Sequence, residues 1–170
     1  MKRKQRILIA GIGNIFLGDD AFGSEVAREM MRLSLPEGVS VSDFGIRSYD
    51  LAYALMDGVD AAILVDAASR GGRPGTVYLI EPMVSGIDAC GEGVADAHSM
   101  DVLSVLRMVR SLGADICKIY LVGCEPASLE TEDGRLGLSE TVRAAVPRAI
   151  EMIQSLLSDF LCEGQRVKTN

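Results

Sequence analysis

Residues 7–23 read ILIAGIGNIFLGDDAFG, and this stretch decides the fold class of the chain. Its first part is a continuous apolar run, and we expect a strand over residues 6–10 that is buried on both faces. A loop punctuated by glycines follows over residues 11–18. From residue 21 to residue 33, apolar side chains recur at helical spacing, which predicts a helix. A buried strand that leads through a loop into a helix is typical of the opening unit of an α/β sheet.

The alternation of apolar strands and amphipathic helices continues along the chain. We expect further strands over residues 39–44, 61–65, 76–80 and 116–123, and helices over residues 50–56, 99–109 and 139–161. Residues 67–75 are too few for a helical crossover, so the strand that follows them is expected to pair antiparallel with a neighbour. The fold class is therefore α/β, a three-layer sandwich in which helices flank a twisted, mixed but mostly parallel five-stranded sheet.

Several boundaries are marked by single residues or by composition. Asp50 is expected to cap the second helix, and Pro147 is expected to kink or offset the first turns of the last helix. Residues 81–97 form a polar stretch that is long for a loop in a compact domain, which indicates a functional role. We expect one domain over residues 1–162 and a disordered polar tail over residues 163–170.

Composition narrows the class of partner and the compartment. The chain has 170 residues, is 48% hydrophobic and carries a net charge of −7. Because an acidic chain repels phosphate backbones, nucleic acid is not expected as a partner. The basic start of the chain imitates a signal peptide, but the apolar run behind it contains glycines and lacks a cleavage pattern. No stretch is long enough to span a bilayer, so we expect a cytoplasmic protein without membrane association.

The cysteines do not form a recognisable metal or redox motif. They lie at Cys90, Cys117, Cys124 and Cys162, with no C-x-x-C pair. Their spacing is irregular and unsuited to a zinc cluster, and two of them fall in or beside an apolar run. We expect free, buried thiols in a reducing compartment rather than disulfides.

The candidate site residues are Asp20, Asp66 and His98, the single histidine, with Asp19 and Glu125 as weaker candidates. The acidic residues follow three different apolar runs, and His98 precedes a predicted helix. In an open α/β sheet, ligands bind beyond the carboxyl ends of the strands, where these residues would meet. One imidazole and two carboxylates suit a metal such as nickel, zinc, manganese or iron, or an acid/base site. Each residue also has a structural explanation, above all Asp19, because carboxylates in the first turn of a helix stabilise it.

Nucleotide binding is the competing interpretation of the opening loop. Gly11 and Gly13 follow a strand and precede a helix, as in a dinucleotide-binding fingerprint. The third glycine of that fingerprint is replaced by Phe16, and the pair Asp19-Asp20 would repel a pyrophosphate. The chain also lacks the G-K-[ST] end of a P-loop. We therefore exclude dinucleotide and P-loop binding, and the absence of G-x-S-x-G argues against a serine hydrolase elbow.

A set of longer stretches resembles one known family over nearly the whole chain. The opening fits the pattern G-[IV]-G-N-x(4)-D-[DE]-x-x-G, and further matching stretches lie at residues 43–48, 63–67, 98–103, 122–129 and 137–139. Together they resemble the hydrogenase maturation endopeptidases. The resemblance implies a twisted mixed sheet flanked by helices. It also implies removal of a C-terminal extension from the large-subunit precursor of a nickel–iron hydrogenase after nickel insertion.

The resemblance also assigns roles to the candidate residues. Asp20, Asp66 and His98 match the family's nickel-recognising ligands, and the nickel would be carried by the client rather than held permanently by this chain. Many relatives carry Glu where this chain has Asp20, which shortens the side chain by one methylene. If carboxylates perform the hydrolysis, Asp20 and Asp66 are the available acid/base pair. The client groove is expected at residues 45–50 and 81–97.

Two other functions fit the same residues. The first is a chaperone or binding module that senses nickel on a metalloenzyme client without cutting it. The second is a different peptidase with the same fold, because a fold does not fix a function.

Overall fold

The computed structural model describes residues 4–81, 102–115, 117–129 and 136–166. Its strands are β1 (Ile7–Ile12), β2 (Val39–Gly45), β3 (Ala61–Ala67), β4 (Val77–Ile80) and β5 (Lys118–Cys124). Its helices are the 3-10 helix η1 (Gly18–Ala21), then α1 (Phe22–Met30), α2 (Ser48–Met56), α3 (Val102–Ser111), α4 (Glu140–Arg143) and α5 (Val146–Arg166). No helix in these described ranges is both long enough and apolar enough to cross a bilayer.

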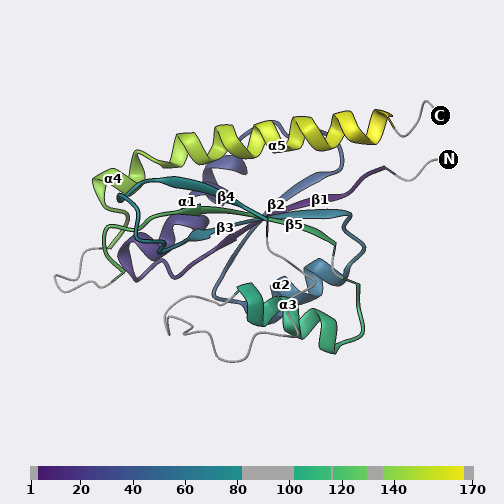
Figure 1. Ribbon diagram of the computed structural model, residues 1–170, viewed down its shortest axis with the longest axis horizontal. Coiled ribbons are helices and arrows are strands. Elements are labelled where there is room, and N and C mark those ends of the chain that lie inside the picture. The colour runs from purple at the N-terminus through teal and green to yellow at the C-terminus, as the bar shows by residue number, and fades with distance from the viewer. Residues whose placement is uncertain (1–3, 82–101, 116, 130–135, 167–170) are drawn as a thin grey trace.

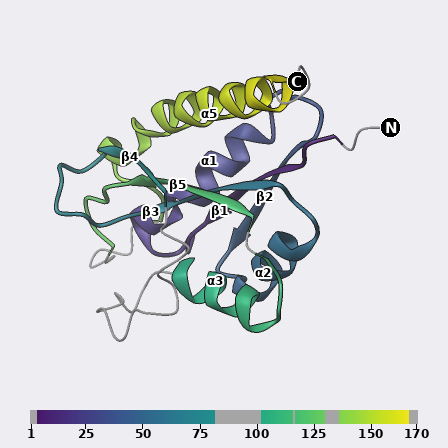
Figure 2. The same ribbon diagram turned by 45° about the vertical axis from the view of Figure 1, so that its right-hand side comes forward.

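The strands form one mixed sheet with the order β2-β1-β3-β5-β4, in which only β4 runs antiparallel to its partner. This confirms the predicted fold class, including the antiparallel fourth strand. Helices α1 and α5 cover one face of the sheet, and α2 and α3 cover the other (Figures 1 and 2). The carboxyl ends of β1, β3 and β5 meet at the end of the molecule opposite both chain termini (Figure 1).

Several predicted boundaries differ from the structure for local physical reasons. The last predicted helix is divided into α4 and α5, because Pro147 has no backbone N–H and occupies the first turn of α5. Helix α5 continues through Arg166, so the first four residues of the predicted tail are helical and residues 167–170 lie outside the described chain. Asp50 does not cap α2. It lies in the first turn, and its carboxylate pairs with Arg47 at 3.2 Å.

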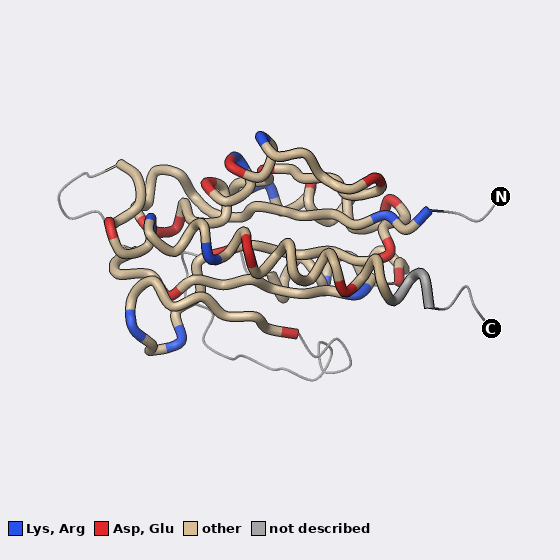
Figure 3. The backbone as a smooth tube through the Cα atoms, turned by 90° about the horizontal axis from the view of Figure 1, so that it is seen from above, with Lys and Arg blue, Asp and Glu red and all other residues tan. Residues whose placement is uncertain are grey.

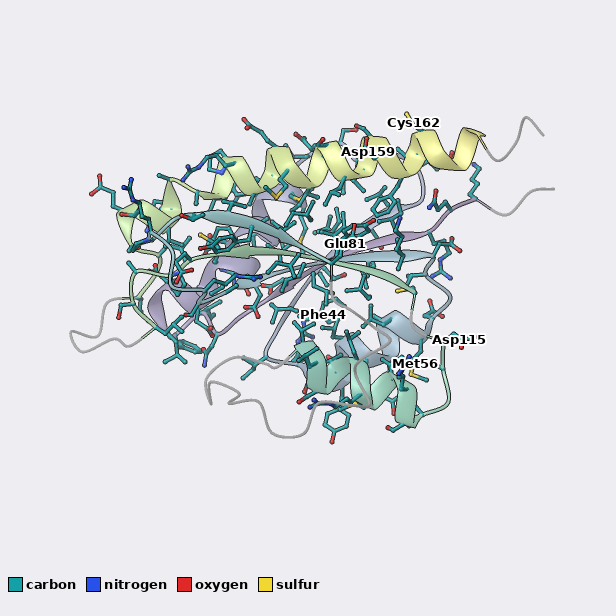
Figure 4. The ribbon with its side chains drawn as sticks, viewed as in Figure 1. Phe44, Met56, Glu81, Asp115, Asp159 and Cys162 are labelled. Atoms are coloured by element: carbon teal, nitrogen blue, oxygen red, sulfur yellow. The ribbon has the colours of Figure 1, made fainter. Side chains whose placement is uncertain are left out.

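The three thiols that the structure describes are free, as predicted, but they are not all buried. Cys124 is buried, Cys117 is partly buried and Cys162 is exposed on the outer side of α5 (Figure 4). Burial raises the pKa of both Cys117 and Cys124 to about 11, so these thiols are protonated at neutral pH. Cys90 lies outside the described residues.

Glycines let α1 approach the sheet backbone closely. A Cβ at Gly23 would collide with the carbonyl oxygens of Val65 and Ile12, which lie on two neighbouring strands. A Cβ at Gly11 would collide with the carbonyl oxygen of Gly23 and would lie 2.6 Å from the Cβ of Ala27. The start of α1 therefore rests directly on the backbone of β1 and β3.

Replacing Gly23 with alanine tests this close approach. We expect Gly23→Ala to lower the free energy of unfolding by about 3 kcal/mol or more, because backbone atoms on two strands would have to move. Gly113→Ala is the matched control, since it has a φ of +77° and no neighbouring atom within 4 Å. Its cost is backbone strain alone, about 1–2 kcal/mol. Equal losses in urea unfolding would contradict the close approach.

Candidate active site

Four buried carboxylates lie at the edge where the parallel strands end. Within the described chain, the buried charged residues are Asp19, Asp20, Asp66 and Glu125. Two of them belong to η1 after β1, one is the second-last residue of β3, and one directly follows β5. Burying four carboxylates at one edge is costly unless each one has partners or a chemical role.

Asp20 and Asp66 form an interacting pair. Their side chains are 3% and 5% exposed. Asp20 Oδ2 accepts a hydrogen bond from the backbone N–H of Asn14 at 2.7 Å. Burial and then the nearby charge of Asp20 raise the pKa of Asp66 well above its usual value, although the N–H of Ala67 opposes this shift by donating to Asp66 Oδ1 at 2.8 Å. The structure thus brings together two of the three predicted site residues.

The pair depends on the sheet register for its position. Gly11 lies opposite Val65 on the adjacent strands β1 and β3, and Asp66 lies opposite Gly123 on β5. The chain leaves β1 through the loop at Gly13, which has a φ of +138° and no room for a Cβ against the carbonyl of Asp20. That turn folds η1 back over the end of β3, so that Asp20 meets Asp66.

Asp19 has a different role, which explains why it is buried. Asp19 Oδ2 accepts from the backbone N–H of Ala127 at 2.8 Å and of Ser128 at 3.2 Å, and from the hydroxyl of Ser139 at 3.0 Å. Asp19 Oδ1 accepts from the N–H of Ser139 at 2.7 Å. The structural role predicted for Asp19 was to stabilise the first turn of its own helix. Its partners, however, belong to the segment after β5 and to the start of α4, not to its own helix.

Glu125 anchors the loop between β3 and β4. Its carboxylate accepts from the backbone N–H of Arg70 at 2.8 Å, from that of Gly71 at 3.2 Å and from the hydroxyl of Tyr78 at 2.9 Å. Sequence reasoning ranked Glu125 low. The available signal was its position directly after a buried strand, the same position that singled out Asp66.

His98 lies outside the described residues, and so does most of the predicted groove segment 81–97. Among the described residues, no group of three or more His, Cys, Asp or Glu side chains is arranged to hold a metal ion. Asp20 and Asp66 supply two carboxylates at one edge, which are suitable oxygen donors for a divalent metal. They fit a metal that brings further ligands of its own.

A cleft of about 250 Å³ opens between the loop after β1 and the loop after β2. Its lining includes Asn14, whose N–H binds Asp20, but neither Asp20 nor Asp66. The N–H of Gly13 donates to the carbonyl of Gly45 at 3.0 Å, which ties the two loops together. Asp43 forms part of the wall, and its carboxylate accepts from Ser24 Oγ at 2.7 Å. Residues 45–47 of the predicted client groove line this cleft.

Known proteins resemble the chain in both sequence and structure. The HycI family model, described as hydrogenase maturation protease, matches residues 24–156. The hydrogenase 2 maturation protease of Escherichia coli is 31% identical over 156 residues, which cover 91% of this chain and 92% of that protein.

Solved structures of proteins with the same description also resemble this chain. The hydrogenase maturating endopeptidase HybD from E. coli aligns with a TM-score of 0.76 and 29% identity, over 91% of this chain and 93% of that one. The NiFe hydrogenase maturation protease HycI from Thermococcus kodakarensis aligns with a TM-score of 0.67 and 28% identity, over 91% and 93% of the two chains. The chain therefore belongs to the hydrogenase maturation proteases.

Proposed function

We propose that this peptidase removes the C-terminal extension of a nickel–iron hydrogenase large-subunit precursor after nickel insertion, with Asp20 and Asp66 acting on the scissile bond. Membership of the hydrogenase maturation proteases supports hydrolysis of a peptide bond rather than a chaperone that senses nickel without cutting. The observation that carries the choice of residues is the buried, interacting pair of carboxylates at the carboxyl ends of the parallel strands.

The pair supplies both proton-transfer roles that hydrolysis requires. Peptide hydrolysis needs a base to activate water and an acid to protonate the leaving amine. The backbone N–H of Asn14 stabilises a charged Asp20, which suits Asp20 to act as the base. Burial and the charge of Asp20 favour the protonated form of Asp66 as long as no metal is bound, which suits Asp66 to act as the acid. Ligation of a metal by Asp66 would release this proton.

The nickel of the client is part of the substrate in this scheme. Asp20 and Asp66 present oxygen atoms at the sheet edge, and His98 is the third proposed ligand. Three ligands from this chain leave coordination positions that the client's own ligands fill. A precursor without nickel lacks the ion that joins it to this edge, so cleavage follows metal insertion. When bound, the ion would serve as a recognition tag alone, or would also polarise the scissile carbonyl as a Lewis acid.

Removing either carboxylate tests the catalytic pair. We expect Asp20→Asn and Asp66→Asn each to slow release of the C-terminal peptide by about 10²- to 10⁴-fold, because each change removes one proton-transfer group. Mass spectrometry of a nickel-loaded precursor measures the release. Asp159→Asn, on α5 away from the strand ends (Figure 4), is the matched control and should process at the wild-type rate. Full processing by Asp20→Asn or Asp66→Asn would refute the assignment.

Replacing His98 with alanine tests the third ligand. We expect His98→Ala to abolish processing while the far-ultraviolet circular dichroism stays that of the wild type, since the variant lacks one proposed ligand of the client's nickel. Calorimetric titration with Ni²⁺ or Cd²⁺ should show one-site binding by the wild-type protein and none by the variant. Unchanged metal binding together with full processing would place the site elsewhere.

Because of Asp66, we expect the free energy of unfolding to fall as the pH rises, whereas most buried or paired carboxylates make it rise. Because its pKa is raised in the folded state, the folded chain binds this proton more tightly than the unfolded chain does. Stability therefore falls as the pH rises from about 4, the unfolded-state pKa, through the raised folded-state value. Asp66→Asn removes this penalty, so we expect a higher unfolding midpoint than wild type at pH 7 and a difference that disappears near pH 4.

Thermal unfolding of both proteins across that range measures the effect. Asp159→Asn again serves as the control, and the difference between its unfolding midpoint and that of the wild type should not grow from pH 4 to pH 7. A midpoint for Asp66→Asn below that of wild type at pH 7 would show that the charged Asp66 stabilises the fold.

A further inference from the structure

One exposed apolar surface adjoins the cleft between the loops after β1 and β2. It consists of Phe16, Ile46, Tyr49 and Tyr53, which we call the aromatic strip. These side chains are 66%, 64%, 67% and 63% exposed. The strip combines the loop after β1, the loop after β2 and the outer face of α2.

The strip is continuous with the cleft. Phe16 and Ile46 line the cleft from its two loops. Tyr49 and Tyr53 are four residues apart on α2 and therefore lie on one face of that helix, with Tyr49 nearer to Ile46. The opposite face of α2 packs on the sheet through Leu51, Ala52 and Leu55. The strip thus begins at the catalytic edge and follows α2 away from it.

The aromatic content of the strip is unusual for this chain. The sequence has four tyrosines and four phenylalanines. All eight are described, and the three that are exposed (Phe16, Tyr49 and Tyr53) all belong to the strip. Monomeric proteins rarely expose contiguous apolar patches without a function, and aromatic side chains are enriched among the residues that dominate binding energy.

The charges around the strip favour an apolar partner surface. Arg47 and Asp50 lie beside it and pair with each other at 3.2 Å, so their charges are balanced locally. Elsewhere, acidic and basic residues are interspersed along the backbone (Figure 3). The strip therefore offers neither a basic nor an acidic face to a partner.

We propose that the aromatic strip docks an apolar surface of the client precursor next to its scissile segment, so that the enzyme recognises the folded body of the client as well as its tail. This inference rests on the proposed function. The carboxylate pair is almost fully buried, so only a narrow segment of the client reaches it. A specific protein complex buries about 1,200–2,000 Å² in total, far more than a small cleft provides. The strip supplies additional area on the side where the client enters.

Kinetics with a nickel-loaded precursor test the docking role. We expect Tyr49→Gln combined with Tyr53→Gln to raise KM for the precursor about tenfold, the loss expected when interface aromatics are removed, and to leave kcat within about twofold. Glutamine keeps the helix propensity of α2 and removes the apolar surface. Met31→Gln is the matched control. It is a 48% exposed apolar residue at the end of α1, on the opposite face of the sheet, and it should keep the wild-type KM.

The possible outcomes distinguish a failure of the proposed function from a failure of the docking role of the strip. A precursor that the wild-type protein does not cleave overturns the proposed function and, with it, the occupant of the strip. Cleavage by the wild type together with an unchanged KM in the double variant overturns only the docking role of the strip. A change of sedimentation coefficient in the double variant would assign the strip to contacts between copies of this chain and would also overturn it. Circular dichroism checks folding, and Tyr53→Gln alone carries the test if the double variant is unfolded.

Discussion

The direct contact between the start of α1 and the backbone of β1 and β3 is the constraint on which the site depends. Gly23 lies against carbonyl oxygens on both strands, and Gly11 lies against Gly23, so neither position has room for a side chain. This contact holds η1 above the strand ends instead of beside them. Asp20 therefore lies next to Asp66, which the sheet delivers from the neighbouring strand.

The four buried carboxylates divide into two kinds according to their partners. Asp19 accepts four hydrogen bonds and Glu125 accepts three, all from segments distant in sequence, and these bonds compensate the cost of burial. Asp66 instead receives the N–H of its own neighbour Ala67 and faces the charge of Asp20. That arrangement opposes stability and favours the protonated form of Asp66. The two anchoring carboxylates hold the surrounding loops, so the strained pair keeps its geometry.

Local patterns predicted the sheet, its mixed direction and the acidic residues, because apolar runs and strand ends are properties of neighbouring residues. Asp19 was interpreted as a residue that stabilises its own helix, because its partners 108 to 120 residues away leave no signal in a single sequence. The same is true of the collision at Gly23, which needs two strands and a helix in place. Asp50 looked like a cap because carboxylates favour that position, yet the helix begins at Ser48, so Asp50 lies within the first turn and pairs there with Arg47.

The sheet edge joins elements from both faces of the molecule, and the proposed docking of a client protein uses both of them. The layer of α1 and α5 contributes Asp20 through η1, whereas the layer of α2 and α3 contributes Tyr49 and Tyr53. Between them, the loops after β1 and β2 are tied by the bond from Gly13 to Gly45. In the proposed complex, the scissile segment enters near this tie and the body of the client lies over α2. The proposed chemistry and the proposed recognition could therefore change separately, since they involve helices that pack on opposite faces of one sheet.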